Sequence, residues 1–413
     1  MATPCAAVLL DPAVVRIVSA FQNGIYEDLV PLRSLRPPNL RSRYFFPQDT
    51  ITKNAELLEP WLTSYKTTRI QRSIGAFERF QLCLTVHAIF VGDLSLVGFL
   101  DEHGLVPVDE ALIDIAARYG HMPIVEYLHP RSTATTHAMD WAASRGHLKI
   151  VQFLHELRQE GCTTSAMSGA AAGGHLDVIQ FLHANRTEGA SHKAMDNAAD
   201  QGHLDIVQFL HANRTEGASS KAIDWSASKG HLAIVEWLHW NRADGATTDA
   251  LDWASTNGHT DVVQFLLAHR TEGGTFKAMD GAARNGHLDV LKILHAHGLT
   301  CTTDAMDFAA QNGYVDVLEW LHHVSATCTE EAMTGAASKG FIDVVKWLVI
   351  HDKPCDDGKV LCTAAEENHL ELVMWLWEHG KQACGTKAMH KSMSRGHVDV
   401  VDYLYAALHT SSS

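Results

Sequence analysis

A Gly-His dipeptide recurs along this chain at intervals of 26 to 28 residues, most often 28. A fixed period in this range indicates a stack of small similar units, each in contact only with its neighbours. Stacking also allows 413 residues to fold without one very large core. The copies are Gly120-His121, Gly146-His147, Gly174-His175, Gly202-His203, Gly230-His231, Gly258-His259, Gly286-His287 and Gly396-His397, with degenerate copies at Gly313-Tyr314, Gly340-Phe341 and Asn368-His369 and an earlier candidate at Gly92-Asp93.

The residues of one unit predict two short helices joined by a tight turn. In residues 219–245, the hydroxyl of Ser219 or Ser220 can cap the first helix, and Gly230 permits the left-handed turn that ends it. The second helix is expected over residues 231–241, where apolar residues recur at helical spacing. The hydroxyl recurs at Thr135, Thr163, Ser191, Thr247, Thr275, Thr302 and Thr329, and an acid recurs in the first turn of the second helix at Asp177, Asp205, Asp261, Asp289, Asp316, Asp343 and Asp399.

One segment of the period, Ala138-Met139-Asp140-Trp141-Ala142-Ala143-Ser144-Arg145-Gly146-His147-Leu148, resembles the ankyrin repeat. The resemblance covers residues 76–409 in about 12 units, and it implies an all-α, ankyrin-like helix-turn-helix repeat solenoid. The family period is about 33 residues, so we expect shortened β-hairpin fingers. The histidine of the family's T-P-L-H motif is kept only at His390 and is replaced at Asp114, Asp140, Asp196, Asp224, Asp252, Asp280 and Asp307.

The net charge and the absence of catalytic motifs disfavour several classes of function. The formal net charge is −15, which disfavours binding to the phosphate backbone of a nucleic acid. No apolar run approaches the length of a membrane span. The chain contains no HExxH, GxSxG or GxxxxGK[ST] motif, so we expect neither an enzyme nor a bound cofactor. The resemblance implies instead a scaffold that binds another protein, whose identity the sequence does not indicate.

The 27 histidines and the recurring aspartates suggest metal ligands, but their spacing favours structural roles. Zinc ligands converge to about 2.1 Å from the ion, whereas neighbouring helices are about 8–10 Å apart. We expect the Gly-His imidazole to start the second helix and to bond nearby backbone. We expect the recurring aspartate to accept from backbone N–H groups or from that imidazole, since one carboxylate per layer is too few for calcium. A second histidine series follows eight residues later at His129, His155, His183, His211, His239, His295 and His322.

The position five residues before the turn glycine varies most. It holds Trp141, Trp225 and Trp253, and elsewhere Ile115, Gly169, Asn197, Gly281, Phe308, Gly335, Thr363 or Lys391, so we do not interpret it as a core position. The resemblance implies that it faces the concave side of the array, where exposed aromatic residues suit a partner. The alternative that these tryptophans fold over the shortened fingers stays open. The candidate partner-binding residues are Trp141, Arg145, Trp225, Lys229, Trp253, Asn257, Arg284, Asn285, Phe308, Asn312 and Lys339.

Residues 1–75 break the period and are expected to form a helical cap and linker, while residues 410–413 form a short tail. Residues 7–35 weakly resemble an F-box, which suggests the alternative of a substrate adaptor for a ubiquitin ligase. The first residues lack a basic segment before their apolar run, so no secretory signal is expected. We expect a cytoplasmic monomer, with the nucleus as an alternative location.

Overall fold

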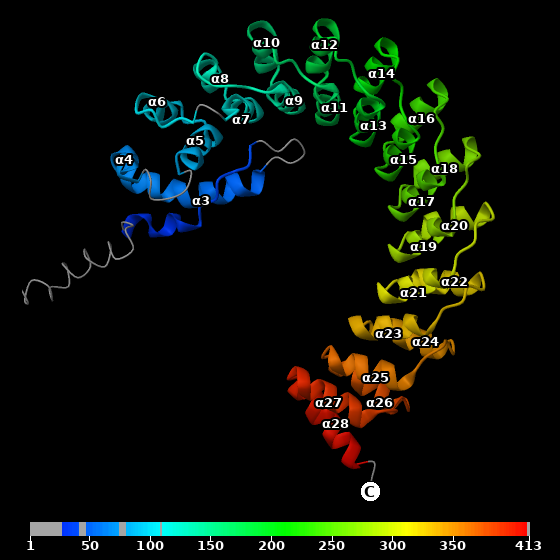
Figure 1. Ribbon diagram of the computed structural model, residues 1–413. Coiled ribbons are helices and arrows are strands. Elements are labelled where there is room, and N and C mark those ends of the chain that lie inside the picture. Colours follow the sequence, from blue (N-terminus) through cyan, green and yellow to red (C-terminus); the bar gives the residue numbers. More distant parts are fainter. Residues whose placement is uncertain (1–26, 41–46, 74–79, 108–109, 411–413) are drawn as a thin grey trace, which may run out of the picture. The chain divides into compact units, whose positions relative to one another are not determined.

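The computed structural model describes residues 27–40, 47–73, 80–107 and 110–410 (Figure 1). Within these ranges the regular structure is helical, and no β-strand is present. The chain divides into two compact units, Met1–Ala194 and Met195–Ser413. The predicted all-α repeat solenoid is confirmed, and irregular loops occupy the place of the family's β-hairpin fingers.

The first unit begins with a short 3-10 helix and a long helix, and continues with paired short helices. Its elements are η1 (Glu27–Ser34), α3 (Gln48–Tyr65), η2 (Lys66–Arg69), α4 (Ile70–Ser73), α5 (Phe80–Val91), α6 (Leu94–Glu102), α7 (Leu112–Tyr119), α8 (Met122–Leu128), α9 (Thr136–Ser144), α10 (Leu148–Leu157), α11 (Thr164–Gly173) and α12 (Leu176–Asn185). The next helix, α13 (His192–Asp200), crosses the division between the units.

The second unit consists of helix pairs up to the end of the described chain. Its elements are α14 (Leu204–Asn213), α15 (Lys221–Ser228), α16 (Leu232–Asn241), α17 (Thr248–Thr256), α18 (Thr260–His269), α19 (Phe276–Arg284), α20 (Leu288–Ala296), α21 (Thr303–Gln311), α22 (Val315–His323), α23 (Glu330–Lys339), α24 (Ile342–Ile350), α25 (Asp357–Glu366), α26 (Leu370–Glu378), α27 (Gly385–Arg395) and α28 (Val398–Thr410). Within this unit the odd-numbered first helices α15–α21 form one row and the even-numbered second helices α16–α22 form another (Figure 1).

Local capping explains where the helices begin and end. The hydroxyl of Thr247 accepts from the backbone N–H of Asp249, and the hydroxyl of Ser219 accepts from that of Lys221. Of the two serines that the sequence offered, Ser219 is therefore the one whose side chain caps α15. At the other end, Gly230 has φ 76°, a left-handed conformation that stops the first helix.

Small residues on the first helix and branched residues on the second build the core. In α15 the alanines Ala222 and Ala227 are buried, and in α16 Ile234, Val235 and Leu238 are buried. The same pattern recurs through both units. Alanine lets neighbouring first helices approach closely, while the branched side chains fill the space between layers.

Most of the predictions for the N-terminal region concern residues outside the ranges that the structure describes. Residues 1–26, which include most of the F-box-like segment and the start without a secretory signal, lie outside the described ranges. The boundary that we expected after residue 75 also lies outside them, within 74–79, as do residues 411–413 of the expected tail. Among the described residues, Leu29 and Leu32 of η1 are buried, and so are Leu58 and Trp61 of α3.

Candidate partner-binding face

The imidazole of the Gly-His motif joins its repeat to the one before it. Its Nε2–H donates to a backbone carbonyl about one period earlier, for example from His259 to Ser228 at 3.0 Å and from His369 to Ser338 at 3.0 Å. Each histidine is the N-cap residue of its second helix, as predicted. The predicted bond to backbone is also present, and its acceptor belongs to the preceding repeat.

The same imidazole explains why the glycine must accompany the histidine. A Cβ on Gly230 would lie 2.6 Å from Nδ1 of His259, and one on Gly258 would lie 2.6 Å from the ring of His287. The glycine therefore supplies both a positive φ and the room for the next repeat's ring. The two residues recur together because the glycine of one repeat lies against the histidine ring of the next.

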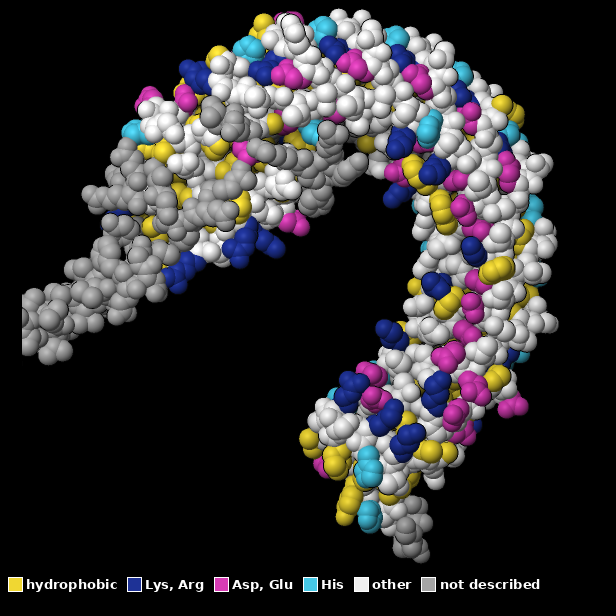
Figure 2. Space-filling view, viewed as in Figure 1, with side chains coloured by type: hydrophobic (Ala, Val, Ile, Leu, Met, Phe, Trp, Pro, Cys, Tyr) yellow, Lys and Arg dark blue, Asp and Glu magenta, His cyan; other side chains and the backbone are white. Residues whose placement is uncertain are grey.

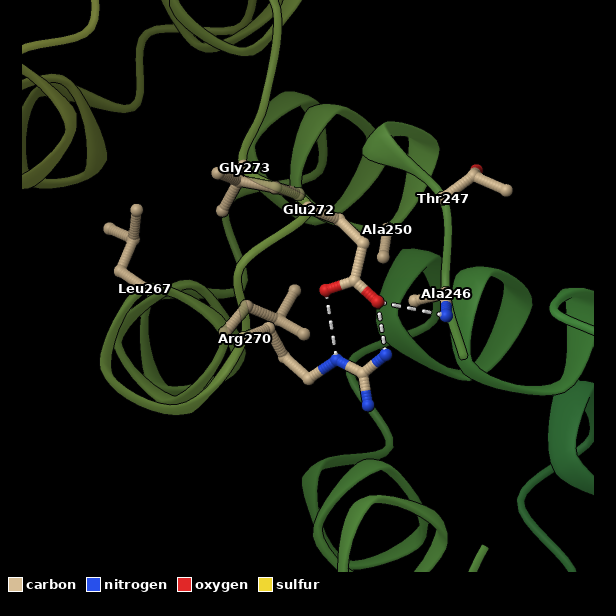
Figure 3. Close-up of a pocket in the computed structure, with 9 residues that line it drawn as sticks. Ala246, Thr247, Ala250, Leu267, Arg270, Glu272 and Gly273 are labelled. Carbon is tan, nitrogen blue, oxygen red and sulfur yellow. Dashed lines mark hydrogen bonds and ion pairs between the residues drawn. The ribbon is translucent and has the colours of Figure 1, made fainter. Parts of the chain in front are cut away.

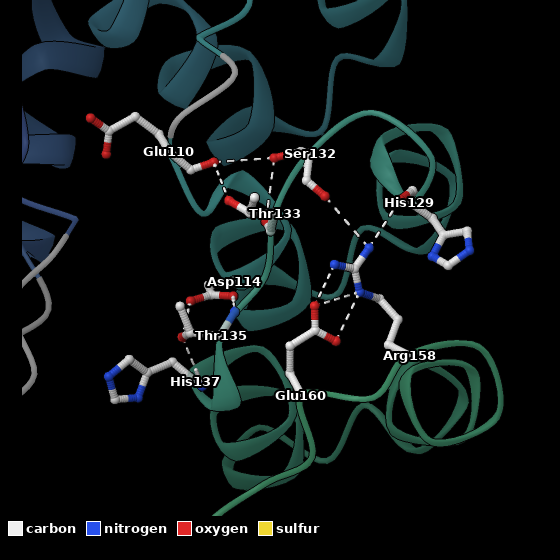
Figure 4. A network of polar contacts seen from close by, with 9 residues as sticks. All are labelled: Glu110, Asp114, His129, Ser132, Thr133, Thr135, His137, Arg158 and Glu160. Carbon is white, nitrogen blue, oxygen red and sulfur yellow. Dashed lines mark hydrogen bonds and ion pairs between the residues drawn. The ribbon is translucent and has the colours of Figure 1, made fainter.

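The recurring aspartates form a second connection between repeats (Figure 4). The carboxylate of Asp114 accepts from the backbone N–H of Thr135 at 2.8 Å and from its hydroxyl at 2.5 Å. Burial raises the pKa of Asp114 to about 7, against the effect of these two donors. The same pair of bonds links Asp140 to Thr163, Asp196 to Ser219, Asp224 to Thr247, Asp252 to Thr275, Asp280 to Thr302 and Asp307 to Thr329. Of the two partners predicted for the aspartate, the neighbouring backbone N–H is the one that it uses.

An arginine and an acid two residues later order the loops that replace the fingers. In Figure 3, Arg270 pairs with Glu272, whose other contact is with the backbone N–H of Ala246 in the preceding loop at 3.2 Å. Burial opposes ionisation of Glu272, but the bonds from Arg270 prevail and lower its pKa to about 2. The crevice beside this pair has a volume of about 50 Å³. Smaller crevices recur at the same place in other repeats, so this space is part of repeat packing and is far smaller than a ligand pocket.

The second histidine series packs between successive second helices. His239 meets the ring of Phe265 edge-on with centroids 5.5 Å apart, and its Nδ1 lies 3.3 Å from a guanidinium nitrogen of Arg270. Because arginine only donates, this imidazole accepts and is therefore neutral. Burial and the charge of Arg270 lower the pKa of His239. Among the described residues, no three His, Cys, Asp or Glu side chains gather closely enough to hold a metal ion.

The candidate partner-binding residues divide between the units. Trp141 and Arg145 belong to the first unit, and the other nine belong to the second unit, on or just after α15, α17, α19, α21 and α23. Trp253 is 38% exposed, and Trp225 is half-buried with the Lys221 ammonium 5.3 Å from its ring centre. In the first unit Trp141 stacks on His137 with centroids 4.9 Å apart. Trp141 and Trp225 thus contact side chains of their own first helices.

The inference that the variable position lies outside the core is wrong for α7. Ile115 occupies it in α7 and is 1% exposed, so there it belongs to the core. A Cβ on Gly281 would lie 2.0 Å from Oγ1 of Thr256, and one on Gly335 would lie 2.1 Å from Cγ of Gln311. Glycine is therefore required where the preceding first helix comes close.

The side chains of the asparagines just after the first helices are exposed, and their amides also bond to the backbone of the preceding repeat. The side-chain amide of Asn257 donates to the carbonyl of Ser228 at 2.8 Å, and that of Asn285 donates to Thr256 at 2.7 Å. Asn312 makes the equivalent bond to Arg284 at 3.1 Å, and the Arg284 guanidinium lies 3.6 Å from the ring centre of Phe308. These contacts fix the first-helix face as a continuous polar and aromatic surface.

Sequence reasoning missed a second row on this face. Lys221, Lys277 and Phe276 are exposed at the start of α15 and α19. The missed signal is helical spacing, since Lys221 precedes Trp225 by one turn and lies on the same side of the helix. We define the ridge as Lys221, Trp225, Lys229, Trp253, Lys277 and Arg284.

A comparison with known families identifies the family of this chain. Among solved structures, the chain is similar to the ankyrin repeat domain of human ASB11, with 16% identity and a TM-score of 0.37 over 45% of this chain and 96% of that one. No curated protein matches the chain. None of the described helices is long and apolar enough to cross a membrane. The family described as "Ankyrin repeats (3 copies)" matches residues 139–224, 197–280, 222–307 and 333–411, which together make up more than half of the sequence. The chain belongs to the ankyrin repeat family.

Proposed function

We propose that the protein is a non-enzymatic scaffold and that the first-helix face of its second unit binds another protein. Ankyrin repeats generally mediate protein–protein interaction, and proteins built from them are typically interaction scaffolds without catalysis. The observation that carries the proposal is the exposure of Trp253 beside the half-buried Trp225 on successive first helices. Large aromatic side chains that are already exposed and held in place are the commonest anchors of protein interfaces.

The rigidity of the face supports the same proposal. The buried aspartate bonds hold α15, α17 and α19 to one another, and the amides of Asn257 and Asn285 bridge the same helices at the surface. A surface that is ordered before binding loses little conformational entropy when a partner docks. The polar residues Lys229 and Asn257 follow the helices that carry Trp225 and Trp253, and with Lys339 at the end of α23 they can supply the rim of the interface.

Paired affinity captures test this function. The full-length chain and its Trp225→Ala/Trp253→Ala variant would each be immobilised, and the bound proteins would be quantified by mass spectrometry. Exposed aromatics elsewhere provide a matched control, Trp240→Ala/Tyr405→Ala, on α16 and α28. We expect a partner whose recovery falls at least about tenfold with the first variant and is unchanged with the control. Recovery that is the same from all three proteins would contradict the proposal.

A further inference from the structure

The two faces of the repeats α15–α22 carry opposite surface charge. Apart from the buried aspartates that link the repeats, the charged residues described on the first helices and the turn after α15 are four cations and two carboxylates. They are Lys221, Lys229, Lys277, Arg284, Asp249 and Asp304. The charged residues of the second helices are one lysine and five acids, Lys292 with Glu236, Asp261, Asp289, Asp316 and Glu319. In a chain of net charge −15, the ridge is thus a cationic stretch flanked by acidic surface.

Aromatic and cationic side chains alternate along the ridge. Figure 2 shows Lys and Arg side chains next to apolar ones on this side of the second unit. The Lys221 ammonium lies 5.3 Å from the ring centre of Trp225, and the Arg284 guanidinium lies 3.6 Å from that of Phe308. No ion pair is present between the described carboxylates and Lys221, Lys229, Lys277 or Arg284. These cations are held over aromatic rings or in solvent, where an approaching carboxylate can reach them.

We propose that the ridge binds an acidic protein segment whose carboxylates alternate with apolar side chains. This inference rests on the proposed function and specifies the chemistry of its partner. The partner's carboxylates would pair with Lys221, Lys229 and Lys277, while its apolar side chains would cover Trp225 and Trp253. Opposite charge across the interface would speed association, and the acidic second helices would repel segments that approach from the other side.

Charge distribution favours a peptide over a nucleic acid. A nucleic acid presents phosphates at a fixed spacing, and some of them would meet Asp249 or Asp304 on the first helices or the acids of the second helices. A protein segment can instead place polar or basic residues opposite those carboxylates. A second copy of this chain is disfavoured by mutual repulsion between molecules of charge −15.

Peptide selection followed by charge reversal tests the inference. A random peptide library displayed on phage would be selected against the full-length chain, and a selected peptide would be labelled with fluorescein for anisotropy. We expect the selected peptides to be rich in Asp, Glu and apolar residues. The variant Lys221→Glu/Lys229→Glu/Lys277→Glu should weaken binding at least about tenfold, and the Gln versions of the same changes should weaken it less. The affinity of the wild type should also fall between 0.1 and 1 M salt, since salt screens exposed charges.

A matched control carries the same change of net charge on second helices. The variant Lys149→Glu/Lys292→Glu/Lys346→Glu alters α10, α20 and α24 and should bind within about twofold of the wild type. An equal loss in this control would overturn the inference, because total charge rather than the ridge would then govern binding. Circular dichroism of each variant checks that the repeats remain folded.

The remaining outcomes separate this inference from the proposed function. If Trp225→Ala/Trp253→Ala weakens binding while charge reversal does not, the face binds partners but not through acidic residues, and only the inference fails. If neither variant weakens binding, both fail. Selection of neutral or basic peptides, or of none, overturns the inference. Competition by a labelled oligothymidylate would show a nucleic-acid site, and self-association in sedimentation would show a second copy. Either result would also overturn it.

Discussion

Repeats that carry the buried aspartate and the repeats at the C-terminal end are joined by different kinds of contact. From α15 to α23, each first helix is linked to the next through a carboxylate that is at most 6% exposed, such as Asp252, and that accepts from Thr275. In α23, α25 and α27 the corresponding position holds Thr334, Cys362 and His390. There the aspartate link is absent, and besides histidine bonds such as that of His369 and a bond from Ser392 to Ala365, surface ion pairs connect the repeats, with Glu366 accepting from both Lys391 and Arg395.

This difference indicates an uneven distribution of stability along the second unit. A buried carboxylate with two donors cannot be removed without leaving those donors unpaired. A surface ion pair exchanges its partner for water at little cost and weakens in salt. We therefore expect the repeats joined by aspartate to unfold last and the C-terminal repeats to open first.

The largest effect should come from removing a buried aspartate. Asp252→Ala deletes the acceptor for both the backbone N–H and the hydroxyl of Thr275, each at 2.7 Å. The free energy of unfolding should fall by about 4 kcal/mol, because two partly buried donors lose their partner and a void remains where the buried carboxylate was. Urea denaturation followed by circular dichroism measures the change. Glu366→Ala serves as the comparison from the C-terminal repeats, and an equal loss there would remove the distinction between the two regions.

The next effect is a difference in pH dependence. Burial raises the pKa of Asp114 to about 7, above its unfolded value of about 3.8. Its protonated form is therefore favoured by folding, so its contribution is complete below pH 4 and is lost as the pH rises towards 7. The wild type should lose about 3 kcal/mol relative to Asp114→Asn over this range. Urea denaturation of both proteins at pH 4, 5, 6 and 7 measures the difference, and parallel curves would contradict it.

The C-terminal repeats should respond to acid in the opposite direction. The hydrogen bonds from Lys391 and Arg395 lower the pKa of Glu366 below its ordinary value of 4.5. The contribution of Glu366 is thus present above pH 4.5 and is lost as the pH falls through its lowered pKa. Hydrogen exchange at pH 7 and pH 4, corrected for intrinsic rates, should therefore show α25–α28 weakening in acid.

A fourth prediction compares one glycine position in the two regions. Gly258 has φ +78°, and a Cβ there would lie 2.6 Å from the ring of His287, whereas Gly396 has φ +77° and nothing within 4 Å. Gly396→Ala should cost about 1 kcal/mol for the left-handed backbone alone. Gly258→Ala should cost about 2 kcal/mol, because the imidazole must also move. Equal losses in urea denaturation would show that the histidine contact adds nothing.

Contacts between residues a few positions apart could be predicted from the sequence, whereas contacts between repeats could not. The cap at Thr247 and the turn at Gly230 follow from residues within a few positions of each other. The acceptor for His259 lies 31 residues earlier, at Ser228. Every repeat holds similar residues at the same positions. The period therefore does not indicate which residue of a neighbouring repeat a side chain contacts.

The residues of the candidate face could be predicted from the sequence only in part, for the same reason. Helical spacing from Trp225 leads directly to Lys221, and the repeated pair of Arg270 and Glu272 recurs visibly along the sequence. Burial of Ile115 in α7 depends on what packs around that helix, which the repeat pattern does not encode. The close approach that requires Gly281 likewise depends on the spacing between α17 and α19.

The smallest effect tests the surface ion pairs by salt. Raising the salt concentration from 0.1 to 1 M shortens the Debye length from about 10 to about 3 Å, which weakens the 2.6 Å contact of Lys391 with Glu366 and the 2.9 Å contact of Arg395 with Glu366. Hydrogen exchange in α25–α28 should accelerate by about twofold or less, while exchange in α17–α20 stays constant. In Glu366→Gln the acceleration should be smaller, since the neutral amide removes two ion pairs while those of Lys359 with Glu331 and of Lys381 with Asp357 remain. Salt sensitivity that is uniform along the second unit would mean that its two regions are held together by the same forces.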